Sequence, residues 1–280
     1  MLRMRTRTAS GSRMAAAFAK NQSGLAAIEF AFLLPLMLAI YFGIVELSQG
    51  LSASRKIDLV AHAMSDLVGQ ITGDPTVIPV TSGPNVEASL CDSGTNGVCV
   101  ASNDIGQVFA AGAALIAPLP ATSLKITISE VNIQLIGGAY KATVDWSVAY
   151  NGGTLRNGTG CTLNTYLSAS DVAPVSPTSM PTSFTNAAAT PTLGPLIVAD
   201  VTYTYNSTIG QLFPAWIPSA NNILMQRTSY SPIRNTYTNT IPTPALFNHI
   251  QAPTTATTWA TSITGATNVN CLGYLTPKLR

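Results

Sequence analysis

The feature that most constrains this chain is an apolar run from Leu25 to Val45, which contains a single charged residue, Glu29. At a rise of 1.5 Å per residue, a helix of about 20 apolar residues crosses a hydrocarbon core roughly 30 Å thick. The sequence therefore predicts one membrane-spanning helix. It also raises the question of why that helix carries a carboxylate.

The residues before this run are basic. Residues 1–24 contain five Lys or Arg and no Asp or Glu, and basic segments of this kind stay on the cytoplasmic side of a membrane. An ordinary cleavable signal peptide has a shorter apolar core and an A-x-A-like site, whereas this run ends in "IVELSQG". We therefore expect residues 1–24 to be a basic leader and the bulk of the chain to lie outside the cytoplasm.

Charge elsewhere is sparse. Charged residues make up 9% of the chain, and residues 25–280 carry nine Lys or Arg against twelve Asp or Glu. The basic character thus belongs to the leader, which disfavours nucleic-acid binding by the folded part.

Glu29 needs a specific explanation, because a carboxylate inside a bilayer costs several kcal/mol unless it finds a partner or reaches the interface. A position in the first turns of the helix lowers this cost, since the helix dipole favours negative charge there. A cut after Gly24 would supply a partner: Leu25 would become a new amino terminus and Glu29 the fifth residue of the mature chain.

Gly24 followed by "LAAIEF" and "AFLLPLMLAIYFG" resembles the processing site of type IV prepilins and pseudopilins. The longer stretch from Gly24 to Gly50 is similar to the TadE/TadG-like proteins of tight-adherence (Tad, Flp-type) pili, and residues 123–235 resemble them loosely. The resemblance implies that a membrane-embedded prepilin peptidase cleaves between Gly24 and Leu25. It also implies that Glu29 pairs with the freed amine of a neighbouring subunit.

Two alternatives stay open within this segment. Gly24 could remain uncut, with Glu29 acting as an interfacial residue of a permanent membrane anchor. Pro35 removes one backbone donor, so a helix kink that lets packed helices adjust is expected; membrane helices also simply tolerate proline.

Helical periodicity continues beyond the membrane. From Ile57 apolar residues recur on one helical face, and "TGDP" at 72–75 predicts the stop. The expected helix therefore covers residues 25–70, with a transmembrane and an amphipathic part. The residues expected on the apolar face are Ile57, Val60, Met64, Leu67, Val68 and Ile71.

The remainder, residues 71–280, predicts a β-rich head. Residues 140–150 alternate as a half-buried strand, and residues 124–136 form a second strand whose apolar parity slips between Ile128 and Val131, which suggests a bulge. Gly137 and Gly138 supply the hairpin turn between them. Further strands are expected at 196–205 and 222–234, a short helix at 109–119, and a Pro/Thr/Ser-rich loop or linker at 172–195. The fold class is α+β: a long membrane-spanning helix and an extracytoplasmic antiparallel sheet with long loops, as in pilins.

Four cysteines in a chain that leaves the cytoplasm favour disulfides. Of the three possible connectivities we expect Cys91 with Cys99 and Cys161 with Cys271. A metal site is disfavoured because the chain has no C-x-x-C and only two histidines. No hydrolase, metalloprotease or phosphate-loop motif is present, so we expect neither an enzyme nor a cofactor.

Together with these features, the resemblance implies a pseudopilin-like minor subunit or assembly factor of a Tad pilus, in the inner membrane with a cytoplasmic N-terminus and a periplasmic or extracellular head. The expected partners are other pilins and pseudopilins, the prepilin peptidase, the inner-membrane assembly platform and membrane lipid. The alternatives are a permanently anchored envelope protein that links the pilus base to other components, and an adhesive surface subunit.

Overall fold

The computed structural model describes residues 23–71, 97–99, 102–156, 166–172, 176–185, 194–207, 222–234, 249–251, 263 and 265–270. The chain divides into two compact units, Met1–Gly50 and Leu51–Arg280. The second is called the head unit below.

Helix α2, Ser23–Gly69, is one continuous helix of 47 residues with Pro35 inside it. In the first unit its residues from Ala26 onward are almost all exposed. In the head unit the same helix buries one stripe, which includes Ile57, Val60 and Met64. The long helix and the α+β class predicted from the sequence are confirmed. Leu67, expected on the buried face, is instead 43% exposed.

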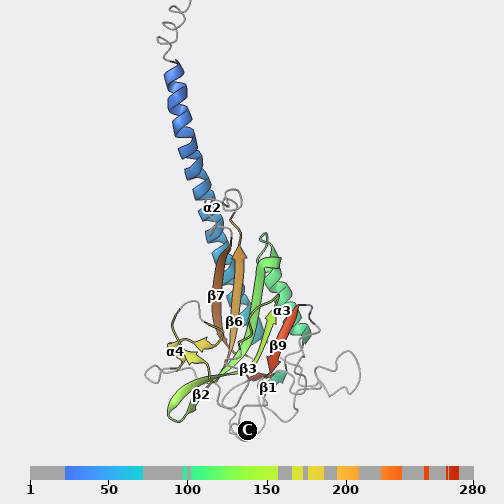
Figure 1. Ribbon diagram of the computed structural model, residues 1–280. Coiled ribbons are helices and arrows are strands. Elements are labelled where there is room, and N and C mark those ends of the chain that lie inside the picture. Colours follow the sequence, from blue (N-terminus) through green and yellow to red (C-terminus); the bar gives the residue numbers. More distant parts are fainter. Residues whose placement is uncertain are drawn as a thin grey trace, which may run out of the picture. The chain divides into compact units, whose positions relative to one another are not determined.

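A five-stranded antiparallel sheet forms the body of the head unit, in the order β7-β6-β2-β3-β9 (Figure 1). Gly137 and Gly138 both have positive φ, 62° and 81°, which matches the two-residue turn expected between β2 and β3. The strands predicted at 124–136, 140–150, 196–205 and 222–234 all form, whereas β9 was not predicted. The five strands are β2 (Leu124–Ile136), β3 (Ala139–Tyr150), β6 (Gly194–Tyr205), β7 (Ile223–Pro232) and β9 (Ala266–Asn270).

Short elements surround this sheet. Helix α3 runs from Ser102 to Leu115 and therefore begins earlier than the expected helix at 109–119. The segment 172–195, expected as a loop, includes a strand and a helical turn. The remaining elements are the parallel pair β1 (Gly97–Cys99) with β8 (His249–Gln251), the parallel pair β4 (Ser168–Ala169) with β5 (Ser179–Met180), η2 (Ala121–Ser123) and α4 (Thr182–Thr185).

The larger hydrophobic core lies on the face of the sheet that α2 and α3 cover, called the helix face. Ile126 and Ile128 of β2 point into it, as do alternate residues of β6 from Ile197 onward. Each fully buried side chain of this size stabilises the fold by about 1.5–3 kcal/mol. Gly112 allows close packing here, because a Cβ at this position would lie 2.7 Å from Ile126 Cδ1 and 3.1 Å from Met64 Sδ.

A second core lies on the opposite face, called the outer face. It is covered by residues 166–172 and 176–185, the covering segment, whose Leu167 and Met180 are buried. The sheet residues in this core are Val131, Ile133, Ala142, Val144, Leu196 and Val198. The sheet is therefore buried on one face along part of its length and on the other face along the rest.

The apolar pattern of β2 is irregular because its buried apolar residues lie on the helix face up to Ile128 and on the outer face from Val131. The β2–β3 ladder shifts register between Glu130 and Val131, in the region expected, but β2 stays in register with β6, so the bulge suggested for this strand is not on β2. Glu130 pairs with Trp146 and Val131 with Val144, so the extra residue of the bulge is Asp145, on β3.

The half-buried strand expected at 140–150 is wrong in one respect, because its polar face is buried too. Thr143, Asp145 and Ser147 are at most 6% exposed. For Ser147 the physical reason is that Arg156 encloses the outer face: Ser147 Oγ accepts from the Arg156 backbone N–H and lies beside Ser129 Oγ. Thr143, on the other side of the bulge, donates to the carbonyl oxygen of Asn132.

Polar contacts fix the second half of α2 against β7. Arg227 Nη2 donates to Ser54 Oγ at 2.9 Å, and Ser229 Oγ lies 2.9 Å from both Ser65 Oγ and His62 Nδ1. At the end of the helix, the backbone N–H of Arg234 donates to the carbonyl oxygen of Gly69 at 2.8 Å. Because the contacts advance in the same direction along both elements, α2 and β7 run parallel.

Gly69 lies close to the backbone at the end of β7. A Cβ on Gly69 would lie 2.9 Å from the carbonyl oxygen of Pro232, whereas a Cβ on Gly50 would meet nothing within 4 Å. We predict that Gly69→Ala lowers the free energy of unfolding of the head by about 1–3 kcal/mol, because rigid backbone must shift. Denaturant unfolding of the detergent-solubilised chain, followed by circular dichroism, measures this.

Gly50→Ala is the matched control, and it should leave stability unchanged or raise it by up to about 1 kcal/mol, since Ala favours helix over Gly. Equal stability of the two variants would contradict the close approach.

Candidate functional site

The exposed first half of α2 is the first candidate site. Large apolar side chains project from every side of the helix, among them Phe32 at 78% and Met37 at 66% exposed. A helix that is apolar all round is stable in lipid or among other apolar helices, and not in water. By length and composition α2 is the one helix among the described residues that could cross a membrane, which is compatible with a single-pass anchor.

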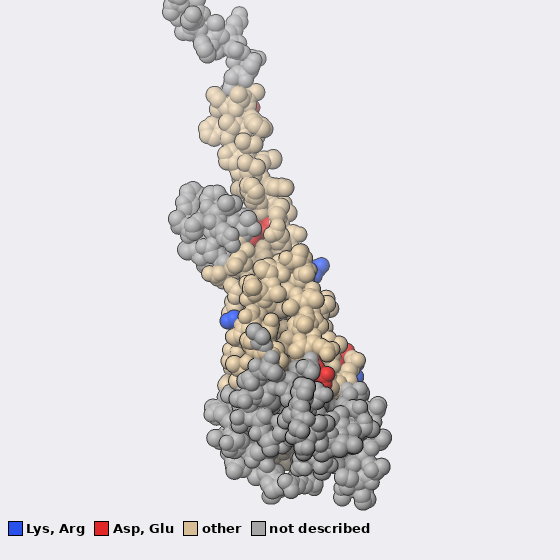
Figure 2. Space-filling view, turned by 90° about the vertical axis from the view of Figure 1, so that its right-hand side faces the viewer, with Lys and Arg blue, Asp and Glu red and all other residues tan. Residues whose placement is uncertain are grey.

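On the face that Figure 2 shows, this segment carries little charge. The exposed large apolar residues of the first unit are Ile28, Phe30, Phe32, Leu33, Leu34, Leu36, Met37, Leu38, Ile40, Tyr41, Phe42, Ile44 and Leu47. Glu29, also exposed, is the only charged residue between Leu25 and Val45.

The residues expected at the processing site all lie in α2. Gly24 and Leu25 belong to its first turn, and Glu29 follows one turn after Leu25, about 6 Å along the helix axis. Pro35 is inside the helix, which continues past it without a break. Cleavage after Gly24, the pairing of Glu29 and a kink at Pro35 stay predictions.

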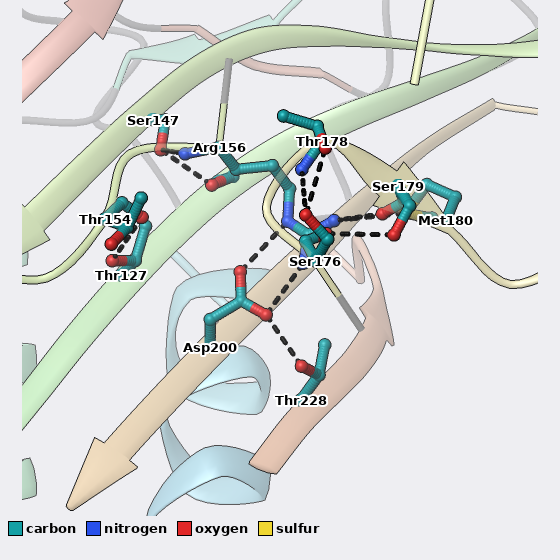
Figure 3. A network of polar contacts seen from close by, with 11 residues as sticks. Thr127, Ser147, Thr154, Arg156, Ser176, Thr178, Ser179, Met180, Asp200 and Thr228 are labelled. Carbon is teal, nitrogen blue, oxygen red and sulfur yellow. Dashed lines mark hydrogen bonds and ion pairs between the residues drawn. The ribbon is translucent and has the colours of Figure 1, made fainter. Parts of the chain in front are cut away.

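A buried ion pair in the head unit is a second polar centre, which the sequence did not reveal. Arg156 is fully buried and binds Asp200 of β6 with two hydrogen bonds: Nε to Oδ2 at 3.0 Å and Nη2 to Oδ1 at 2.7 Å (Figure 3). Thr228 Oγ1 of β7 donates to the same Asp200 Oδ1 at 2.7 Å. A bidentate pair of this kind combines charge with fixed geometry.

The guanidinium also reaches the covering segment. Arg156 Nη1 donates to the carbonyl oxygen of Ser179 at 2.5 Å, and its backbone N–H donates to Ser147 Oγ of β3 at 2.9 Å. Ser147 Oγ in turn lies 2.8 Å from Ser129 Oγ of β2. Arg156 therefore connects strands β2, β3 and β6 to the covering segment, and its arrangement is that of a structural clamp.

A further polar contact lies at the bulge. Trp146 Nε1 donates to Glu130 Oε2 at 2.7 Å, and both side chains are fully buried. This contact joins β3 to β2 next to Asp145, where the ladder is interrupted.

Tyr230 lies beside the clamp and packs on Phe184, with ring centroids 4.9 Å apart. Burial raises the pKa of the Tyr230 hydroxyl to about 12, while the charge of Arg156 lowers this pKa and that of Asp200 raises it. Its Oη makes no hydrogen bond among the described residues. The neutral form is therefore the one that the fold favours.

The cysteine prediction is left open by the structure. Cys99 ends strand β1, whereas Cys91, Cys161 and Cys271 lie outside the described residues, as does "TGDP" at 72–75. Within the described ranges there is no group of three or more His, Cys, Asp or Glu that could hold a metal ion.

Sequence reasoning missed the clamp because its members are far apart. Arg156 and Asp200 are separated by 44 positions, and neither stands in a recognisable motif. One signal was available: Asp200 interrupts the apolar strand "LIVADVTYTY". A buried carboxylate requires a cationic or hydrogen-bonding partner.

The comparison with known families bears on α2. Residues 24–64 match the family model described as TadE-like protein. No curated protein and no solved structure matches the chain. The resemblance read from the sequence is thus confirmed over the segment that contains Gly24, Leu25, Glu29 and Pro35, and it supports involvement in Tad pilus assembly.

The clamp gives a stability prediction. We expect Arg156→Met to lower the free energy of unfolding by about 3–5 kcal/mol, because it leaves Asp200 charged in a buried site. The double variant Arg156→Met/Asp200→Leu should lose less than Arg156→Met alone, since it removes both charges. Denaturant titrations of the three proteins test this order.

The exposed pair Arg234–Asp66, with Nη1 to Oδ1 at 3.1 Å, provides the control. Arg234→Met should cost at most about 1 kcal/mol. A similar loss for Arg156→Met and Arg234→Met would contradict the role of the clamp.

The pKa of Tyr230 gives a pH prediction. An unfolded tyrosine titrates at about 10 and the folded one at about 12, so its contribution to stability is complete below pH ~10 and is lost as pH rises through 12. Tyr230→Phe should flatten this part of the curve of unfolding free energy against pH. A residual slope is expected from Tyr203, whose pKa burial also raises. An unchanged slope in the variant would show that Tyr230 is not responsible.

Proposed function

We propose that this chain, TadE-like over residues 24–64, is a pseudopilin-like minor subunit or assembly factor of a Tad pilus. The observation that carries the proposal is the exposed apolar run from Leu25 to Val45, whose one charged residue, Glu29, lies five residues after Gly24. The helix inserts once into the inner membrane, with its basic leader in the cytoplasm and the head unit outside.

Processing is the first step of the proposed mechanism. A prepilin peptidase hydrolyses the peptide bond between Gly24 and Leu25. Water adds its oxygen to the Gly24 carbonyl carbon and its protons to the Leu25 nitrogen, which leaves a carboxylate on Gly24 and an ammonium group on Leu25. The missing Cβ of Gly24 lets the peptidase approach the backbone closely.

Assembly follows by lateral packing of apolar helices from other pilins and pseudopilins. The Glu29 carboxylate of one subunit pairs with the Leu25 ammonium of its neighbour, and the attraction between the two charges offsets part of the cost of taking them out of water. The pair also fixes the register of two helices that are otherwise uniformly apolar. The inner-membrane assembly platform supplies the work of extraction, and the chain itself catalyses no reaction.

The test combines two substitutions in the native host. Gly24→Ala should leave a precursor that is longer by the 24 leader residues on a gel and begins at Met1. Glu29→Gln should still be processed. Its amount in sheared filaments, or in the complexes they grow from, should be at least about tenfold lower than that of the wild type, a ratio that corresponds to 1.4 kcal/mol. N-terminal sequencing and quantitative immunoblots of membranes and filaments measure both.

Gly43→Ala and Glu46→Gln serve as controls, since they change the same residue types within the same helix. A wild-type protein that begins at Met1 would favour the permanent anchor instead. Normal incorporation of Glu29→Gln would contradict the charge pairing.

A further inference from the structure

One end of the sheet exposes apolar side chains next to the point where the chain enters the head unit. Strand β6 ends at Tyr205, which pairs with Ile223 at the start of β7, so β6 ends and β7 begins at the same end of the sheet (Figure 1). At this end Ile223 is 41% and Leu224 is 65% exposed.

The contacts between α2 and β7 show which part of α2 lies beside this end of the sheet. Arg227 contacts Ser54, Ser229 contacts His62 and Ser65, and Arg234 contacts Gly69. Because the two elements run parallel, the start of β7 lies toward the Leu51 end of α2. Leu51 itself is 54% exposed, and we call Leu51, Ile223 and Leu224 the Leu224 patch.

Covalent connection keeps this patch near the apolar span, whatever the arrangement of the two units. Leu51 lies six positions after Val45, the last residue of the apolar run. Even a fully extended chain bridges at most about 20 Å over that length, and a helix bridges about 9 Å. The headgroup region adds roughly 5–8 Å to each side of the hydrocarbon core.

The charges beside the patch include two arginines. Arg55 is exposed and the Arg227 side chain is 46% exposed, whereas the nearby acids are Asp58, 3.9 Å from the Arg227 Nε, and Glu46, five residues before Leu51. Apolar side chains flanked by arginines are typical of surfaces that lie in the headgroup layer of anionic membranes.

We propose that the Leu224 patch is a membrane-contact surface, by which the head unit rests on the lipid bilayer that α2 spans. This inference depends on the membrane anchoring in the proposed function, but not on cleavage or pilus assembly. The partner is the phospholipid surface itself. Leu51, Ile223 and Leu224 contact the boundary between headgroups and acyl chains, and Arg55 and Arg227 contact anionic headgroups. Contact at this end limits the directions in which the sheet can tilt relative to the membrane.

Depth-dependent fluorescence quenching tests the contact on the full chain. The chain is reconstituted into vesicles of phosphatidylethanolamine and phosphatidylglycerol, with and without brominated acyl chains. Leu224→Trp is compared with Leu135→Trp, because Leu135 is also exposed, at 56%, but lies about 35 Å away along β2 at the hairpin end of the sheet. The emission of the unsubstituted chain is subtracted, since Trp146, Trp216 and Trp259 are present in every sample.

The added tryptophan at position 224 should be quenched by brominated lipid at least about twofold more strongly than the one at position 135. Equal quenching at the two positions, in a chain that floats with the vesicles, would overturn the contact and leave the anchoring intact. A chain that does not float with the vesicles would overturn the membrane anchoring of the proposed function, and the contact with it.

Discussion

The structure depends on one helix that must satisfy two different surroundings. The first half of α2 is apolar on all sides, so water is excluded as its medium. The second half is amphipathic, and its buried stripe of Ile57, Val60 and Met64 is part of the largest core of the head unit. The same element therefore requires lipid or neighbouring helices along one part of its length and the sheet along the other.

The sheet also has two different surroundings, one on each face. Its helix face is covered by α2 and α3, and its outer face by the covering segment, each over a different part of the strands. The bulge at Asp145 turns the apolar residues of β3 from one face to the other, so that Trp146 enters the first core and Val144 the second. Polar side chains are buried near this change of face, and among the charged ones Arg156 and Asp200 neutralise each other.

The elements that could be predicted from the sequence are those whose signal lies in neighbouring residues. The apolar run, the helical stripe from Ile57, the strand alternation and the Gly137–Gly138 turn each have a period or a turn chemistry that is written in neighbouring residues. The parity slip at Ile128 and Val131 was located correctly, but its cause was not, because a change of buried face depends on segments far along the chain. The clamp was missed for the same reason, since nothing near Arg156 indicates that Asp200 will approach it.

The position of the second half of α2 also bears on how force passes through the protein during assembly. Ile57, Val60, Met64 and Val68 are fully buried, and Arg227, Ser229 and Arg234 of the β7 region contact the same helix. Pulling this half away from the sheet would expose the main core. In the proposed assembly, moving the first half from lipid to neighbouring pilin helices breaks no contact of that core, so the proposed extraction does not require the head unit to unfold.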